Sequence, residues 1–91
     1  AQAGAWSIGW RWHPSQQFDT CKVRQWLESL DWQRAKLVIH SADGWVSANA
    51  VDNTTLTWQL SEWRRDSRVD LIFSEKQDVA GLQKTLAACR Q

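Results

Sequence analysis

The apolar residues near the start of the chain recur at every second position. They are Trp6, Ile8, Trp10 and Trp12, and Pro14 follows two residues later. A period of two is typical of a β-strand that is buried on one face only. Proline lacks the amide that the interior of a strand needs. The sequence therefore predicts a half-buried strand that Pro14 ends.

Two later segments change to a helical period, in which apolar residues recur three and four positions apart. In residues 18–30 (FDTCKVRQWLESL) the apolar stripe consists of Val23, Trp26, Leu27 and Leu30. In residues 78–90 (DVAGLQKTLAACR) it consists of Val79, Leu82, Leu86 and Cys89. Asp19 and Asp78 precede the stripes, where a carboxylate can accept hydrogen bonds from the free amides of a first turn. We therefore expect two amphipathic helices with Asp19 and Asp78 as their caps.

Four further apolar segments lie between the two expected helices, and each has the length and composition of a strand. They are residues 35–41 (AKLVIHS), 44–51 (GWVSANAV), 55–63 (TLTWQLSEW) and 68–74 (RVDLIFS). The intervening ADG and DNT favour turns, so the first three segments could form an antiparallel meander. The order β-α-β-β-β-β-α predicts an α+β fold, a two-layer sandwich in which two helices cover one face of a mainly antiparallel sheet.

The size and charge of the chain limit its class. Ninety-one residues, 43% of them hydrophobic, suit one compact domain, residues 1–91, with a modest core. A formal net charge of +1 gives no strong electrostatic reason to expect nucleic acid or an anionic membrane as the partner. No apolar stretch is long enough to span a bilayer, and the first residues lack the pattern of a secretory signal. We expect a cytoplasmic protein that binds no membrane.

Tryptophan is unusually frequent, with eight residues in the chain. Large indole rings can compensate for the limited core of a small domain. The residues in phase with the core are Trp6, Trp10, Trp26 and Trp58. Those near the ends of segments are Trp12, Trp32, Trp45 and Trp63. We expect the second group to be partly exposed, where such rings could stack bases or anchor a protein partner.

Few residues favour catalysis or metal binding. None of the four glycines belongs to a phosphate-binding loop. Zinc ligands usually come in short-spaced pairs, which His13, His40, Cys21 and Cys89 do not form. We expect both cysteines to be free thiols; Cys21 falls in the first turn of a helix, which favours reactivity without establishing it. The sequence therefore predicts a chain that is not an enzyme and holds no metal or cofactor of its own.

Arg34 and Lys36 lie two positions apart at the start of an apolar strand, so they point to the same side. Leu37 and Ile39 then point to the opposite side, which the helices must cover. The two cations therefore mark an open, partly polar face of the sheet, next to Trp45 or Trp63. These four residues, Arg34, Lys36, Trp45 and Trp63, are the candidate interaction surface.

Four segments of the chain carry a resemblance to a known family. They are FDTCKVRQWLESL, RAKLVIHS, LSEWRRDSRVDLIFS and DVAGLQKTLAACR. In this order they resemble the C-terminal domain of CobW-like (cobalamin-synthesis W-type) GTPases, which has a Phe-Asp helix with a Trp-Leu pair, an Arg-Ala-Lys-Gly strand, a strand ending near Ile-Gly-Arg and a closing helix with a late Cys. Leu37 stands in place of the family's Gly, and IFSEK in place of Ile-Gly-Arg, so any role of that arginine is not carried over.

The resemblance implies an accessory domain of a nucleotide-dependent metal chaperone or metal-insertion GTPase. In CobW-like proteins the nucleotide and principal metal motifs lie in an N-terminal GTPase domain, to which no segment of this chain corresponds. The chain then looks like an excised C-terminal domain that contacts the GTPase domain, a client metalloprotein or a second copy. GTP, Mg²⁺ and a transition metal, Zn or Co, would belong to the parent protein.

Two other classes of function stay open. A nucleic-acid-binding module would use basic residues as phosphate contacts and exposed Trp residues as stacking platforms, and salt would weaken its binding steeply. Its basic residues would be Arg34, Lys36, Arg64, Arg65 and Arg68, although the near-neutral total charge argues against this class. A small two-layer α+β hydrolase would need an anion site with a nucleophile, and turnover of simple phosphate or acyl esters would reveal it.

Overall fold

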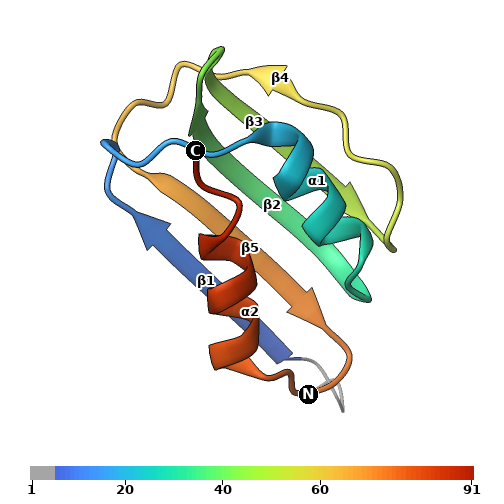
Figure 1. Cartoon of the computed structure of the whole chain (residues 1–91). Coiled ribbons are helices and arrows are strands. Elements are labelled where there is room, and N and C mark those ends of the chain that lie inside the picture. The colour runs from blue at the N-terminus through green and yellow to red at the C-terminus, as the bar shows by residue number, and fades with distance from the viewer. Residues whose placement is uncertain (1–5) are drawn as a thin grey trace.

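The computed structural model describes residues 6–91, in which five strands and two helices form an α+β fold (Figure 1). The strands are β1 (Trp6–Trp12), β2 (Trp32–Ser41), β3 (Gly44–Val51), β4 (Gln59–Leu60) and β5 (Ser67–Phe73). The helices are α1 (Thr20–Glu28), between β1 and β2, and α2 (Val79–Ala87), after β5. The expected fold class is confirmed.

The strands form one antiparallel sheet in the order β1-β5-β2-β3-β4. Strands β2, β3 and β4 make the expected meander, whereas β5 returns to lie between β1 and β2. Both helices lie on the same face of the sheet (Figure 1) and contribute side chains to one core cluster. No helix of the described residues covers the other face, which we call the open face.

Alternation along each strand decides which residues reach the core. In β2 the side chains of Leu37 and Ile39 are buried, while Lys36, which precedes Leu37 and points to the other face, is exposed. The antiparallel register aligns Leu37 with Ala48 of β3 and with Val69 of β5, so residues on one face of three strands bury together. The prediction that Leu37 and Ile39 face the helices is confirmed.

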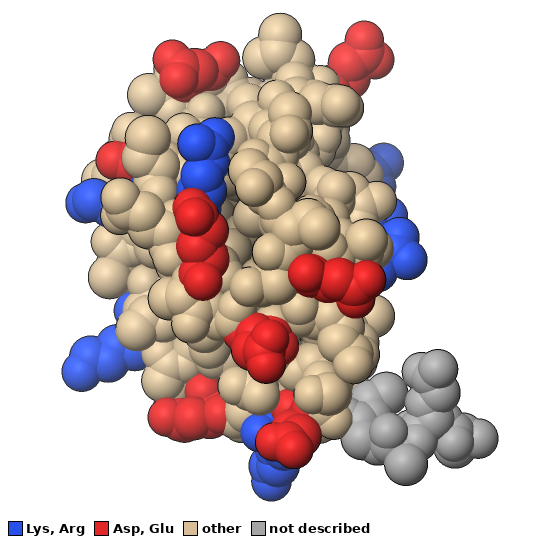
Figure 2. Space-filling model, turned by 90° about the vertical axis from the view of Figure 1, so that its right-hand side faces the viewer, with Lys and Arg blue, Asp and Glu red and all other residues tan. Residues whose placement is uncertain are grey.

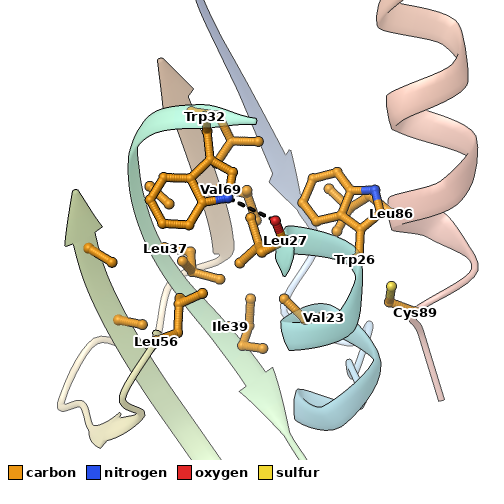
Figure 3. Close-up of a cluster of buried hydrophobic side chains, with 14 of the residues drawn as sticks. Val23, Trp26, Leu27, Trp32, Leu37, Ile39, Leu56, Val69, Leu86 and Cys89 are labelled. Carbon is orange, nitrogen blue, oxygen red and sulfur yellow. Dashed lines mark hydrogen bonds between the residues drawn. The ribbon is translucent and has the colours of Figure 1, made fainter. Parts of the chain in front are cut away.

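The core lies between the helices and the sheet (Figure 3). Val23, Trp26 and Leu27 of α1 converge there with Leu86 of α2, as the apolar stripes predicted, whereas Val79 at the start of the second stripe is 43% exposed. Two indole groups make hydrogen bonds across the packing: Trp26 Nε1 donates to Thr85 Oγ1 of α2 at 2.7 Å, and Trp32 Nε1 donates to the carbonyl of Leu27 at 2.9 Å. These bonds connect α1 to α2 and to β2.

The two helices begin after aspartates, as expected, but the aspartates act differently. The Asp19 carboxylate accepts hydrogen bonds from the amides of Cys21 and Lys22, at 2.9 and 3.2 Å. Asp78 occupies the N-cap of α2, yet its side chain makes no capping hydrogen bond. Only the first helix therefore has the side-chain cap that was predicted.

The strand expected over residues 55–63 is wrong in length, because only β4 pairs with β3 in this segment. The alternation that suggested a strand comes from Leu56 and Trp58, whose side chains pack against the core from an irregular segment. Leu60, the next apolar residue in the series, is 84% exposed. Leu56 and Trp58 therefore anchor an extended connection beside β3.

Two of the four tryptophans expected to be partly exposed are buried. Trp32 is 2% exposed because its ring belongs to the core and its Nε1 is bound to the Leu27 carbonyl. Trp45 is 7% exposed and stacks on the imidazole of His40, with ring centroids 4.6 Å apart. Trp12 and Trp63 are half-buried, as expected.

Candidate functional site

The open face carries polar and charged side chains at alternate positions of the strands. The register places there Arg11 of β1, Arg34 and Lys36 of β2, Asn49 of β3, and Arg68 and Asp70 of β5. These strand positions hold four cations and one carboxylate. Within residues 6–91 the one ion pair joins Arg68 to Asp66, so Arg11, Arg34 and Lys36 make no ion pair there.

One end of the open face is closed by the segment that crosses from β4 to β5. The amide of Ser61 donates to the Trp45 carbonyl at 2.9 Å, and the amide of His40 donates to Ser67 Oγ at 3.0 Å. His40 Nδ1 lies 2.7 Å from the Pro14 carbonyl, which can only accept, so this nitrogen carries the proton. His40 thus holds three segments together and has a structural role in the fold.

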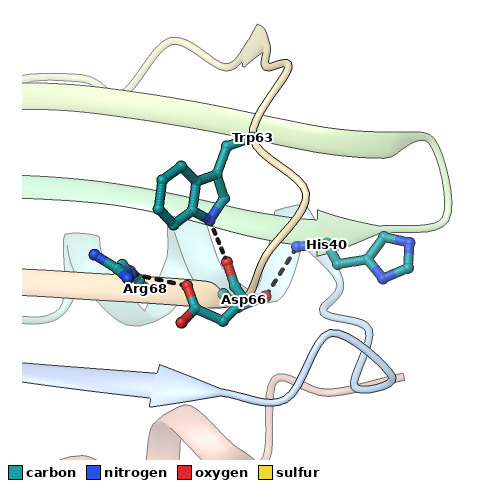
Figure 4. Close-up of polar contacts among 5 residues, drawn as sticks. His40, Trp63, Asp66 and Arg68 are labelled. Carbon is teal, nitrogen blue, oxygen red and sulfur yellow. Dashed lines mark hydrogen bonds and ion pairs between the residues drawn. The ribbon is translucent and has the colours of Figure 1, made fainter.

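The crossing segment places Trp63 over the open face (Figure 4). Trp63 Nε1 donates to the Asp66 carbonyl at 2.8 Å, and the guanidinium carbon of Arg68 lies 4.6 Å from the Trp63 ring centroid. The Arg68 Nε in turn donates to Asp66 Oδ1 at 2.8 Å. This hydrogen bond is the main reason that the pKa of Asp66 lies below its ordinary value, with the charges of Arg68 and Arg11 acting in the same direction.

A groove of about 470 Å³ lies beside this cluster on the open face. Lys36 and Val38 of β2 and Ser47 and Asn49 of β3 line it from the sheet. Other lining residues are Thr57 and Gln59 on the β4 side, Arg68 and Asp70 of β5, and Trp63. The groove thus offers an aromatic surface, two cations, one carboxylate and several neutral hydrogen-bonding groups.

The four residues of the candidate interaction surface share one face but do not meet at one point. Lys36 and Trp63 line the groove together. Arg34 is exposed on the same face, in register with Val51 and Ile72, and does not line the groove. Trp45 is buried against His40, so its ring is not available to a partner in this structure.

Asn49 and Asp70 are among the groove residues that were missed as site residues. A usable signal existed, because Asp70 alternates with the buried Val69 and Leu71, and Asn49 alternates with the buried Ala48 and Ala50. Polar residues in that phase must point to the face opposite the core. Arg68 was considered only as a phosphate contact, yet it contributes to both the Trp63 cluster and the groove.

The surplus of cations is a local property of the open face, since the whole chain has a formal net charge of +1. Figure 2, a quarter turn from Figure 1, shows acidic side chains scattered among uncharged ones, with several basic side chains at the margins of the view. Opposite charges elsewhere on the molecule therefore balance the cations of the open face.

The sulfur and imidazole groups lie apart from the groove. Cys21 is exposed in α1, Cys89 is buried near the chain end, and both are free thiols, as expected. Burial raises the pKa of the Cys89 thiol. His13 is exposed and bonded to Ser15, with Nδ1 and Oγ 2.8 Å apart. In residues 6–91 no three His, Cys, Asp or Glu side chains gather in a group that could hold a metal ion.

The two departures from the CobW-like pattern have different surroundings. Leu37, at the family's Gly, is 3% exposed and belongs to the core. The IFSEK segment ends β5 at Phe73, a fully buried residue, and continues into exposed residues.

In the part of the chain that the structure describes, no helix has the length and apolar character to cross a membrane.

Comparisons with known proteins add no relative to this description. No protein-family model, no curated protein and no solved structure matches the chain. The resemblance to the C-terminal domain of CobW-like GTPases therefore stays a prediction that depends on the quoted motifs.

Proposed function

We propose that this chain is a non-catalytic interaction domain that binds a protein partner through the open face of its sheet. The observation that carries the proposal is the groove lined by Lys36 and Trp63 on a face that no described helix covers. Together with the CobW-like resemblance, it favours the GTPase domain of a metal-insertion protein, or a client metalloprotein of that protein, as the partner.

The charges of the open face support recognition of a protein. Arg34 and Lys36 are exposed and make no ion pair within residues 6–91, so their charges can meet carboxylates of a partner. Charged residues at the edge of an interface mainly set its specificity and association rate. Trp63 is half-buried and held by Asp66 and Arg68, so its indole has a fixed position beside the cations.

Nucleic acid is the second candidate, because the strands of the open face carry four cations and only one carboxylate. Two features favour protein instead. The Asp70 carboxylate lines the groove, where it would repel phosphates. Arg68 and Arg65 lie over the Trp63 ring, at 4.6 and 5.7 Å from its centroid, and so occupy surface on which a base would stack.

The groove does not offer the groups of a hydrolase. Its hydroxyl side chains are Ser47 and Thr57, and its lining contains no histidine or cysteine to activate them. In this proposal GTP, Mg²⁺ and the transition metal, Zn or Co, bind the parent protein. The domain itself contributes only contact surface.

Titration calorimetry of the chain with a CobW-like GTPase domain, with GTP and Mg²⁺ present, tests the proposal. We expect Arg34→Ala/Lys36→Ala to weaken binding by about tenfold, because both cations lie on the proposed interface. The same variant should keep its unfolding temperature within about 3 °C of the parent chain, since both side chains are exposed.

Lys22→Ala/Lys84→Ala is the matched control, because it removes two exposed cations from the helices and should leave binding unchanged. The proposal fails if the open-face variant binds like the parent chain, or if it unfolds several kcal/mol more easily while binding persists. Steeply salt-dependent binding to single-stranded RNA, without binding to the GTPase domain, would establish the nucleic-acid candidate in its place.

A further inference from the structure

Strand β1 forms one edge of the sheet. Among the described residues it pairs with β5 along seven residues and with no other strand. No hydrogen bond outside this ladder uses the main chain of residues 6–12 in the described part of the chain. The opposite edge is blunted, because β4 has only two residues. A long edge with free amides and carbonyls is a template for another strand.

Half-buried apolar side chains, three of them tryptophans, follow the same edge. Trp6, Ile8, Trp10 and Trp12 pack partly against the core from β1 and remain partly exposed. Added strands would cover this remaining apolar surface on the helix side of the sheet. Exposed apolar surface along an unpaired strand favours an interface.

On the open face, the Asp70 carboxylate and the Arg11 guanidinium lie at different positions along β1. The Asp70 side chain leans over Gly9, so closely that a Cβ at Gly9 would meet its carboxylate. Arg11 lies in register with Arg68, whose guanidinium is already fixed by Asp66 and Trp63. Like charges that face each other across strands repel, which favours an outward position of Arg11 at the free edge. Neither Arg11 nor Asp70 makes an ion pair within residues 6–91.

We propose that two copies of this chain associate through β1, in an antiparallel pairing whose twofold axis passes beside Gly9. In this register Arg11 faces Ser7 of the second copy, and Ile8 faces Trp10. Arg11 then lies diagonally from Gly9 of the second copy, over which the carboxylate of Asp70 leans. Diagonal neighbours on adjacent strands are about 7–8 Å apart, within reach of a long side chain.

The edge is self-complementary in this register. Each copy supplies one Arg11 and one Asp70, so the twofold axis generates two reciprocal ion pairs between copies. Arg11 faces the uncharged Ser7, each of the two Asp70 carboxylates beside the axis has an Arg11 of the other copy on its diagonal, and Trp6 faces Trp12 on the helix side. A second copy therefore fits the charge and the apolar surface of β1 together, and the pairing joins two sheets into one of ten strands.

Sedimentation equilibrium of the 91-residue chain tests the pairing. We expect a concentration-dependent dimer that Arg11→Asp or Asp70→Arg weakens by about tenfold each, because each single change places like charges across the interface. The double variant Arg11→Asp/Asp70→Arg should restore the dimer to within about threefold, because it exchanges the two charges. Arg34→Asp, an equal change of charge on the same face away from β1, should leave the dimer unchanged.

Disulfide trapping gives a second readout that does not depend on those charges. With Cys21→Ser removing the exposed native thiol and Asp70→Ala removing the carboxylate that a Cβ at Gly9 would meet, Gly9→Cys should form a disulfide-linked dimer under mild oxidation, because residues paired across antiparallel strands lie about 4.5–5.5 Å apart at their Cα atoms. Ser7→Cys should not, because Ser7 faces Arg11 of the other copy. A monomeric parent chain, a double variant that fails to restore the dimer, or equal trapping at both positions would overturn the proposal.

Discussion

Trp26 connects three parts of the molecule through one side chain. Its ring is 7% exposed within the core, it contacts Trp10 of β1 edge-on, and its Nε1 donates to Thr85 of α2. Trp26→Ala should lower the free energy of unfolding by about 3–5 kcal/mol, because a large buried side chain leaves a cavity. Urea denaturation measures this, and Trp26→Phe should lose less because it keeps an aromatic ring. An unchanged midpoint for Trp26→Ala would contradict the buried position.

The Asp66 carboxylate should make stability depend on acid pH. Its pKa is lowered below the ordinary 3.8 in the folded chain, chiefly by the hydrogen bond from Arg68. A lowered folded-state pKa stabilises the fold above the unfolded-state pKa, and this contribution is lost as pH falls through the folded-state value. Asp66→Asn should therefore flatten the fall in unfolding temperature below about pH 4. An unaltered acid profile would show that the pair with Arg68 does not contribute.

At single residues, the sequence predicted side-chain direction better than burial. Lys36, Leu37 and Ile39 follow directly from alternation along β2. Trp45 was placed with the exposed residues because it lies at a strand end, but His40 stacks on its ring. His40 belongs to the neighbouring strand, so the sequence around Trp45 does not indicate this contact. The candidate surface therefore keeps Lys36 and Trp63 at the groove and loses Trp45.

The N-caps of the two helices, Asp19 and Asp78, offer a matched comparison. Asp19→Ala removes two capping hydrogen bonds from α1 and should cost about 1 kcal/mol of unfolding free energy. Asp78→Ala removes a residue at the same position of α2 that makes no capping hydrogen bond, so it should cost clearly less. Chemical denaturation of both variants measures the difference. Equal losses would show that hydrogen bonding by the cap is not what stabilises α1.

Elements with a strong period were predictable, and the connection between β3 and β5 was not. Helices α1 and α2 and strands β1, β2, β3 and β5 all lie where their apolar periods indicated. The segment 55–63 has the same period as a strand, but Asp52 and Asn53, with φ of 52° and 58°, turn the chain away after β3. Its apolar residues then anchor a connection. Periodicity reports which side chains are buried, and it does not report whether the backbone is paired.

For the whole molecule, the order of elements was enough to predict a sheet with helices on one face. The insertion of β5 between β1 and β2 was not predictable, because no local pattern selects the partner of a strand. The groove was not predictable either. Thr57 and Trp63, which line it, lie in the connections before and after β4, and the second of these connections leads to the position of β5 in the sheet. The open face could be expected from the sequence, whereas its groove required the fold.

Binding through the open face is tested most directly by NMR mapping of the ¹⁵N-labelled chain during titration with a CobW-like GTPase domain. We expect shifts at the amides of Lys36, Val38 and Asn49 and at the indole Nε1–H of Trp63, because these residues line the groove. The amides on the exposed sides of α1 and α2 should not move. Shifts confined to the helices, with the groove residues unchanged at saturation, would contradict open-face binding.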